Sequence, residues 1–240
     1  MEIYMIFNEG LLGSTVHAGV YFGSLLGVLL VAYLLGSINS AIIISHIVYR
    51  EDIRTKGSGN AGMTNMLRNY GKGAALMTLF GDLLKTVIAL VIASVFFGFH
   101  YNAAIAIGGN LGECYLAGLF AVLGHVFPVY YKFKGGKGVL VTSTMALVLT
   151  PIPFLILLLV FIITVALSKY VSLGSVIVAS LYPVVLHGYF TVAFSSSMPA
   201  LAALSSIVIA IIVVWCHRSN LVRIGDRTEN KLSFGKKKDE

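Results

Sequence analysis

Seven apolar stretches run along the chain, and short polar segments separate them. The stretches fall at residues 23–49, 74–99, 111–131, 138–150, 154–167, 173–192 and 199–215. Most reach the roughly 20 residues that a helix needs to cross a hydrocarbon core about 30 Å thick. The stretches at 138–150 and 154–167 are shorter, and the sequence TPIP lies between them. Because proline cannot continue a helix and restricts the residue before it, this region predicts either one kinked helix or a hairpin of two short helices.

The distribution of Lys and Arg decides between these alternatives. With seven helices and the N-terminus outside, the inner segments are 50–73, 132–137, 168–172 and 216–240. These segments hold 16 of the 17 basic residues, and the remaining one, Lys85, lies within a predicted helix. A single span over 138–167 would place Lys169 outside and would invert the basic tail. Because Lys and Arg in short loops stay cytoplasmic, we expect an all-α polytopic membrane protein with about seven transmembrane helices, its N-terminus outside and its C-terminus in the cytoplasm.

Composition supports a membrane protein and excludes a soluble one. The chain is 58% hydrophobic and 11% charged, and its mean hydropathy is +0.90. A soluble protein of 240 residues could not bury so much apolar surface in one core. We expect an N-terminal extension at 1–22, a membrane domain at 23–215 and a basic tail at 216–240.

Four polar segments meet on the predicted inner face, and the first resembles a phosphate cradle in its chemistry. In GSGNAGMTN the glycines allow backbone N–H groups to turn toward a ligand. A helix that begins after such a turn adds the positive end of its dipole. Neutral hydrogen-bonding groups come from Ser58, Asn60, Thr64 and Asn65, and Arg68 follows at helical spacing.

The segment FKGGKG repeats this chemistry with Lys134 and Lys137 on either side of two glycines. It lacks the spacing of a Walker A loop, so ATP binding is not inferred. Basic inner loops also serve orientation alone, and glycine with asparagine often marks only a turn. Because several such segments converge on one face, we expect a site there that handles phosphate groups.

Asp82, Lys85 and His125 are among the ionisable residues that lie within the predicted spans. Asp82 and Lys85 have the i, i+3 spacing of a helical ion pair, and charges at such a depth are costly unless they are paired. We interpret them as a structural pair that braces the loop beside them. His125, near the inner end of the third stretch, is also interpreted as structural.

The polar blocks together resemble a known family. GSGNAGMTNMLRNYGKG…GDLLKT, LGHVFPVYYKFKGGKGV, KYVSLGS and HRSNLVRI…TENK are similar, in order and spacing, to the blocks of the bacterial membrane acyl-phosphate:glycerol-3-phosphate acyltransferases. The resemblance implies transfer of a fatty acyl group from acyl phosphate to the sn-1 hydroxyl of glycerol-3-phosphate. The products would be lysophosphatidic acid and phosphate, in the first acylation step of phospholipid synthesis. It also implies a monomer in the cell membrane whose active site faces the cytoplasm, with no cofactor, metal or nucleic acid.

The resemblance also assigns roles to residues. It implies four catalytic residues, which are Ser58, Lys137, His217 and Asn220. The implied substrate-binding residues are Gly57, Gly59, Asn60, Thr64, Asn65, Arg68, Gly135, Gly136 and Ser172. His217 is either the general base or a binding group, and in the second case a phosphate oxygen of the substrate takes the proton. We favour the second role, because phosphate is already a good leaving group.

Four positions depart from the pattern of this family. They are Met63, Thr86, Cys216 in place of a basic residue and Arg227 in place of a glycine. The principal alternative function is a membrane transporter for a small phosphate-bearing solute. Such a transporter should carry polar groups near the midplane and two related halves, and no internal repeat is detectable.

Overall fold

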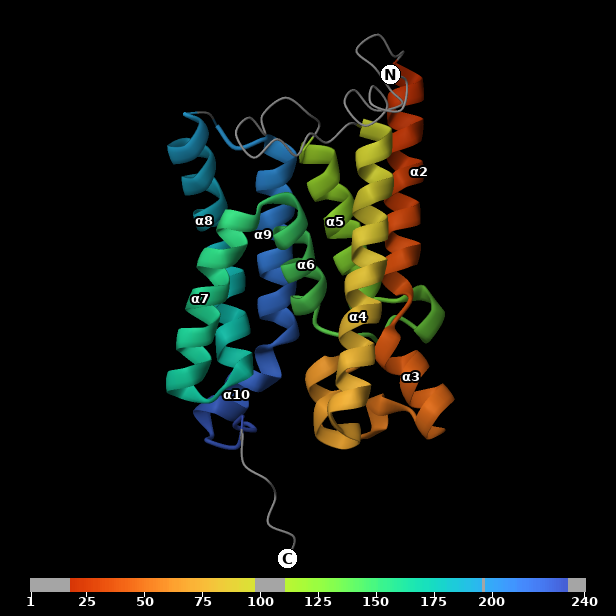
Figure 1. Cartoon of the computed structure of the whole chain (residues 1–240), viewed down its shortest axis with the longest axis vertical. Coiled ribbons are helices and arrows are strands. Elements are labelled where there is room, and N and C mark those ends of the chain that lie inside the picture. The colour runs from red at the N-terminus through yellow and green to blue at the C-terminus, as the bar shows by residue number, and fades with distance from the viewer. Residues whose placement is uncertain (1–17, 98–110, 196, 233–240) are drawn as a thin grey trace, which may run out of the picture.

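In the computed structural model, which describes residues 18–97, 111–195 and 197–232, every regular element is helical. Figure 1 shows the longer helices side by side, with their axes along the long direction of the molecule. The elements are α2 Ala18–Ser37, α3 Ser40–Tyr49, η1 Ile53–Thr55, α4 Met63–Phe97, α5 Leu111–Val126, η2 Val129–Tyr131, α6 Val139–Leu149, α7 Pro151–Ser168, α8 Val171–Phe194, α9 Ala200–Cys216 and α10 Arg218–Gly225.

The first predicted span falls within one candidate membrane segment, Gly19–Tyr49, which the structure divides into two helices. The chain bends between α2 and α3, where the Asn39 side chain accepts a hydrogen bond from the Ile42 N–H at 3.1 Å and caps α3. Ser37, Asn39 and Ser40 are all buried at this bend. The bend therefore places polar groups inside the helix bundle, where other elements of the protein satisfy them.

The second predicted span begins earlier than expected. α4 contains a break at Gly71, whose φ of 82° and ψ of −171° are not helical. The break separates residues 63–70 from the long apolar part of the helix, and only that long part was predicted. The third predicted span agrees with the candidate membrane segment Leu111–Tyr131, in which α5 ends at Val126 and the short helix η2 follows Pro128.

The hairpin predicted around TPIP is confirmed. Thr150 separates α6 from α7, and Pro151 is the first residue of α7, a position where proline's missing N–H costs nothing. The Thr150 hydroxyl hydrogen-bonds the Tyr115 hydroxyl at 2.7 Å. α6 has 11 residues, which is about 16 Å at 1.5 Å per residue, so it is too short to cross a bilayer alone.

A multi-pass membrane architecture follows from the remaining helices. Among the described residues, five segments are long and apolar enough to span a membrane, or six if α9 and α10, bent by 50° at their junction, count as one. The count of seven, which includes α6, stays a prediction. Residues 1–17 of the expected extension and 233–240 of the tail lie outside the described residues.

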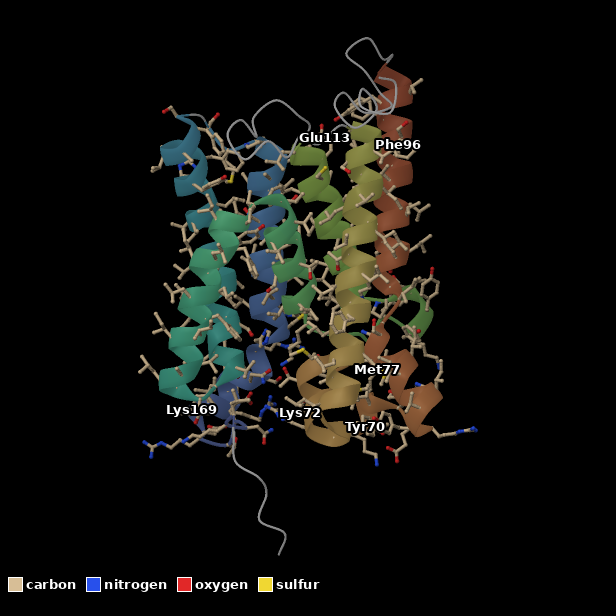
Figure 2. All side chains as sticks on the ribbon, viewed as in Figure 1. Tyr70, Lys72, Met77, Phe96, Glu113 and Lys169 are labelled. Atoms are coloured by element: carbon tan, nitrogen blue, oxygen red, sulfur yellow. The ribbon has the colours of Figure 1, made fainter. Side chains whose placement is uncertain are left out.

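Small residues set the closest helix contacts. A Cβ on Gly36 of α2 would lie 2.2 Å from the Ala121 carbonyl oxygen, and one on Gly124 of α5 would lie 2.2 Å from the Tyr33 carbonyl oxygen. Such close approach of backbones is typical of helix pairs in membranes. Figure 2 shows Lys72 and Lys169 at the end of the bundle where α10 lies, and Glu113 at the opposite end.

Candidate active site

A cavity of about 410 Å³ opens among the start of α4, helices α6 to α9 and the segment around α10. Its volume is within the range of about 300–1,000 Å³ that is typical of small-molecule sites. Nine of the thirteen residues that the sequence indicated line it: Ser58, Asn60, Thr64, Asn65, Arg68, Lys137, Ser172, His217 and Asn220. Gly57, Gly59, Gly135 and Gly136 do not line it and instead shape the loops.

The first glycine loop is organised around the side chain of Asn65. The Asn65 amide nitrogen donates to the carbonyl oxygens of Ile53, Lys56 and Asn60 at 3.2, 3.0 and 3.0 Å. Its amide oxygen accepts from the Ser58 N–H at 3.1 Å. The Asn65 amide is thus occupied within the loop, and it holds Ser58 beside the cavity.

The glycines of this loop are required by its conformation. Gly57 and Gly59 have φ values of 55° and 70°, in the left-handed region that other residues rarely adopt. Arg68 follows on α4 and forms no ion pair with a described residue. Arg68 is among the residues that line the cavity, so a positive charge without a described carboxylate partner lies at its edge.

The second glycine loop is fastened to the end of α5. The N–H groups of Gly135 and Gly136 donate to the carbonyl oxygens of Val126 and His125 at 3.2 and 3.0 Å. Cβ atoms at these glycines would come within 2.1 Å of the His125 carbonyl oxygen and of His125 Nε2, respectively. These N–H groups bind α5 rather than facing the cavity, contrary to the ligand contact expected from the sequence. The glycines allow the close approach that brings Lys137 to the site.

Glu229 joins the remaining site residues into one network. Its Oε1 accepts from the Asn220 amide at 2.6 Å and from the Ser172 hydroxyl at 2.9 Å. Its Oε2 pairs with Arg223 Nε at 2.7 Å. Lys137 Nζ in turn donates to Asn220 Oδ1. The structure thereby brings together Lys137, Ser172 and Asn220.

Sequence reasoning did not assign a role to Glu229, Arg223 or Asn230, although all three line the cavity. The available signal for Glu229 was weak, since it is one of four acidic residues in the tail and lies inside the block TENK. Burial raises the pKa of the Glu229 carboxyl, but hydrogen bonds from Asn220, Arg223 and Ser172 outweigh burial and hold that pKa below its usual value. Glu229 is therefore an ionised acceptor at neutral pH.

Lys137 and His217 differ in charge at neutral pH. Burial lowers the pKa of Lys137 to about 8, so most of this ammonium is still protonated at pH 7. His217 lies past the end of α9, outside the predicted span 199–215, where burial and the nearby Lys137 charge lower the pKa of its ring to about 4. His217 Nδ1 lies 2.8 Å from the Val213 carbonyl oxygen and donates to it. Nε2 of the neutral ring is consequently an acceptor.

The described residues contain no group of three or more His, Cys, Asp or Glu side chains that could hold a metal ion. The cavity offers positive charge, hydroxyl and amide donors and the imidazole acceptor of His217, and the carboxylates of Asp82 and Glu229 and the ring of His125 also line it. The positive charge, the donors and the His217 acceptor match the binding of phosphate and the orientation of an alcohol.

Comparison with known proteins gives a consistent result. The sequence model of the family described as glycerol-3-phosphate acyltransferase matches residues 26–227. A glycerol-3-phosphate acyltransferase of Chlorobium luteolum is 35% identical over 231 residues, which cover 89% of this chain and 98% of the relative. One of Clostridioides difficile is 39% identical over 209 residues, covering 87% of this chain and 95% of the relative.

Solved structures agree with the sequence relatives. The crystal structure of PlsY (YgiH), an integral membrane glycerol 3-phosphate acyltransferase in its glycerol 3-phosphate form, superposes with a TM-score of 0.73 at 30% identity. The match covers 88% of this chain and 96% of that one. Its lysophosphatidic acid form gives a TM-score of 0.70 at 29% identity. The chain therefore belongs to the glycerol-3-phosphate acyltransferase family of integral membrane enzymes, which confirms the resemblance found in its sequence blocks.

Proposed function

We propose that the protein acylates the sn-1 hydroxyl of glycerol-3-phosphate with a fatty acyl group from acyl phosphate, giving lysophosphatidic acid and phosphate. The observation that carries the proposal is a single cavity with a cationic end and an apolar arm. Arg68, Lys137 and Arg223 line the cationic end. The solved relatives support the acceptor and the product, because their two forms hold glycerol 3-phosphate and lysophosphatidic acid.

The apolar arm suits the fatty tail of the acyl donor. It is lined by Ala146 of α6, Phe154 and Leu157 of α7, and Val178 and Tyr182 of α8. From Ser172 to Tyr182 the arm follows α8 for ten residues, or about 15 Å at 1.5 Å per residue. An acyl phosphate that lies with its tail in this arm would present its phosphate and carbonyl to the cationic end.

The proposed reaction is a direct acyl transfer. The sn-1 hydroxyl oxygen attacks the acyl carbonyl carbon, a new ester C–O bond forms, and the C–O bond to phosphate breaks. The hydroxyl proton moves to a phosphate oxygen, so charge and atoms balance. Because the mixed anhydride already has a good leaving group, the enzyme's contribution is positioning and stabilisation of negative charge.

Each site residue has a role in this reaction that follows from its surroundings. Lys137 and Arg68 offset the phosphate charges, and Ser58, Asn60 and Thr64 supply neutral hydrogen bonds to phosphate oxygens. His217 Nε2 accepts the hydrogen bond of the attacking hydroxyl and orients it. A ring whose pKa is about 4 is a weak base near pH 7, which supports proton transfer to the substrate phosphate rather than to His217.

The remaining residues act mainly on the shape of the site; they are Asn65, Ser172, Asn220 and the loop glycines. The contacts described above hold these groups within the protein, and they fix the residues that face the ligand. We also propose that the protein works as a monomer. The positive-inside rule supports a site that faces the cytoplasm, because the basic segments share the end of the bundle where Lys72 and Lys169 lie (Figure 2).

The proposal is tested with purified protein in detergent, supplied with acyl phosphate and glycerol-3-phosphate. Phosphate release and lysophosphatidic acid formation are measured together. We expect both products in equal amounts, and we expect Lys137→Ala to lose most of the kcat/KM for glycerol-3-phosphate. The matched control is Lys134→Ala, since Lys134 belongs to the same loop but is exposed and lies outside the cavity.

Two outcomes would contradict the proposal. One is lysophosphatidic acid formed from an acyl thioester but not from acyl phosphate. The other is full activity of Lys137→Ala. A transporter would instead move glycerol-3-phosphate into proteoliposomes without forming either product.

A further inference from the structure

Three buried ionisable side chains lie beside the site within the spanning helices. Lys85 Nζ of α4 lies 2.8 Å from Asp82 Oδ1 and 3.0 Å from Nδ1 of His125 on α5. All three side chains are almost completely buried. Asp82 and His125 also line the cavity, whereas Lys85 does not. Ionised groups at such positions are costly in a membrane, so this cluster must provide a compensating function.

Lys85 satisfies the backbone where α2 ends. Its ammonium donates to the carbonyl oxygens of Gly36 and Ile38 at 3.1 and 2.7 Å. The last carbonyls of a helix have no partner within the helix and carry its negative dipole end, so a cation is the favourable partner. On the other side of the bend, the Ser40 hydroxyl donates to Asp82 Oδ1 at 3.1 Å. The cluster thereby fastens the bend between α2 and α3 to α4.

The same ammonium fixes the state of His125. The Lys85 ammonium has three hydrogens and four acceptors around it, and because it has donors only, His125 Nδ1 is the acceptor in any hydrogen bond across their 3.0 Å contact. The proton of a neutral His125 ring is then on Nε2. That nitrogen lies against Gly136, where a Cβ would come within 2.1 Å of it. The His125 carbonyl oxygen accepts from the Gly136 N–H at 3.0 Å. Ring and backbone of His125 together set the position of Gly136, and Lys137 is the next residue.

From these contacts we infer that Lys85 is a positioning residue for the acyl-transfer site: through His125 it sets the position of Gly136 and so directs Lys137 toward Asn220. This inference rests on the proposed function only in naming the reaction that Lys137 serves. It goes beyond a structural ion pair, because it assigns the effect of Lys85 to one particular side chain of the cavity. A brace without this role would weaken the fold without depending on Lys137.

The test is a double-mutant cycle of Lys85→Met with Lys137→Ala. Steady-state kcat and KM for glycerol-3-phosphate are measured for the wild type, both single variants and the double variant. We expect Lys85→Met to lower kcat/KM by about tenfold in the wild-type background and by less than about twofold when Lys137 is already Ala. Where Lys137→Ala retains too little turnover, the same cycle is run on equilibrium binding of glycerol-3-phosphate.

Two further variants separate positioning from loss of fold. Because Lys85→Met leaves Asp82 without its cation, Asp82→Asn with Lys85→Met restores neutrality and is measured beside it. His125→Phe keeps a ring against Gly136 but removes the acceptor for Lys85. We expect it to lower kcat/KM when Lys137 is present and to have little effect when Lys137 is already Ala. The matched control is Thr86→Val, a buried change on the same helix, where the hydroxyl donates to the Asp82 carbonyl oxygen at 2.7 Å.

The inference is overturned if Lys85→Met, or the double variant Asp82→Asn with Lys85→Met, lowers kcat/KM by the same factor with and without Lys137. It is also overturned if neither variant changes kcat/KM. Failure of the proposed function looks different, because Lys137→Ala alone would then retain full activity. Melting temperatures in detergent accompany each variant. A variant with a wild-type melting temperature and a Lys137-dependent loss supports positioning.

Discussion

The amide of Asn220 is oriented by Glu229. The Asn220 nitrogen donates to Glu229 Oε1 at 2.6 Å, and the amide oxygen faces Lys137 Nζ. Since an ionised carboxylate only accepts hydrogen bonds, the reverse orientation of the amide would place its oxygen against Glu229. One buried carboxylate therefore decides which atom of Asn220 meets the lysine that faces the cavity.

Replacement of this carboxylate should weaken the site more than the fold. Glu229→Gln removes a charged acceptor that serves Ser172, Asn220 and Arg223, and hydrogen bonds to charged groups are worth about 1.5–3 kcal/mol each. We expect kcat/KM for glycerol-3-phosphate to fall by tenfold or more. A tenfold fall corresponds to a loss of about 1.4 kcal/mol in transition-state stabilisation. Asp226→Asn, an exposed carboxyl change in the same turn, should leave the enzyme near wild type. Equal activity of both variants would argue against the role of Glu229.

The pH dependence of the reaction should report the charge of Lys137. Burial lowers the pKa of this ammonium from 10.5 to about 8, so its positive charge is present below pH 8 and is lost as pH rises through that value. Because the free enzyme's pKa governs kcat/KM, we expect kcat/KM for glycerol-3-phosphate to decline above about pH 8.

Lys137→Arg provides the control for this profile. A guanidinium stays protonated over the whole range, so the decline near pH 8 should disappear even where the overall rate is lower. The measurement is kcat/KM from pH 6 to 10, with acyl phosphate hydrolysis subtracted. A decline that persists unchanged in Lys137→Arg would assign it to another group.

Much of the architecture could be predicted from the sequence, because the apolar runs and the basic loops act locally. The hairpin at TPIP followed from proline geometry and from the side of the membrane on which Lys169 belongs. The bend between α2 and α3 was missed although Gly36, Ser37, Asn39 and Ser40 surround it, because apolar residues continue on both sides and together read as one span. Its stabilising contacts come from Lys85, 47 residues away from Ile38 along the chain.

The site shows the same division between local and distant contacts. Ser58, Arg68, Lys137 and His217 carry chemistry that their own blocks reveal. The role of Glu229 depends on Ser172, a residue 57 positions away, and no short pattern encodes that pairing. Likewise, the sequence indicated that the glycines at 135 and 136 matter, but only the structure shows that their N–H groups bind α5.

Filling the apolar arm should change the preferred acyl chain. Ala146 lines the arm and is buried, so Ala146→Phe places a large ring where we expect the tail of the donor to lie. Turnover of long-chain acyl phosphates should fall more than that of short-chain ones. The measurement is kcat/KM for a series of acyl phosphates of increasing length. Leu147→Phe, at the neighbouring position that is 44% exposed and outside the cavity, should leave the series unchanged. A uniform loss for all chain lengths would contradict this location of the tail.

The conformation of Arg227 accounts for the glycine that the family pattern has at this position, in the turn before Glu229. Arg227 has a φ of 59°, in the left-handed region, where glycine is favoured and other residues bear about 1–2 kcal/mol of strain. The turn is closed by the N–H groups of Thr228 and Glu229, which both donate to the Arg223 carbonyl oxygen at 2.8 and 3.1 Å. It delivers the Glu229 carboxylate to Asn220 and Ser172.

Arg227→Gly should therefore stabilise the protein slightly. Relief of the left-handed strain exceeds the roughly 0.5–1 kcal/mol that glycine's extra freedom in the unfolded chain costs, so we expect a small rise in melting temperature in detergent. Arg227→Ala removes the same side chain without relieving the strain, and it should not raise the melting temperature. Because Arg227 is exposed and does not line the cavity, kcat/KM should stay within about twofold of wild type. If Arg227→Gly lowers the melting temperature while Arg227→Ala does not, left-handed strain at this position does not reduce the stability of the protein.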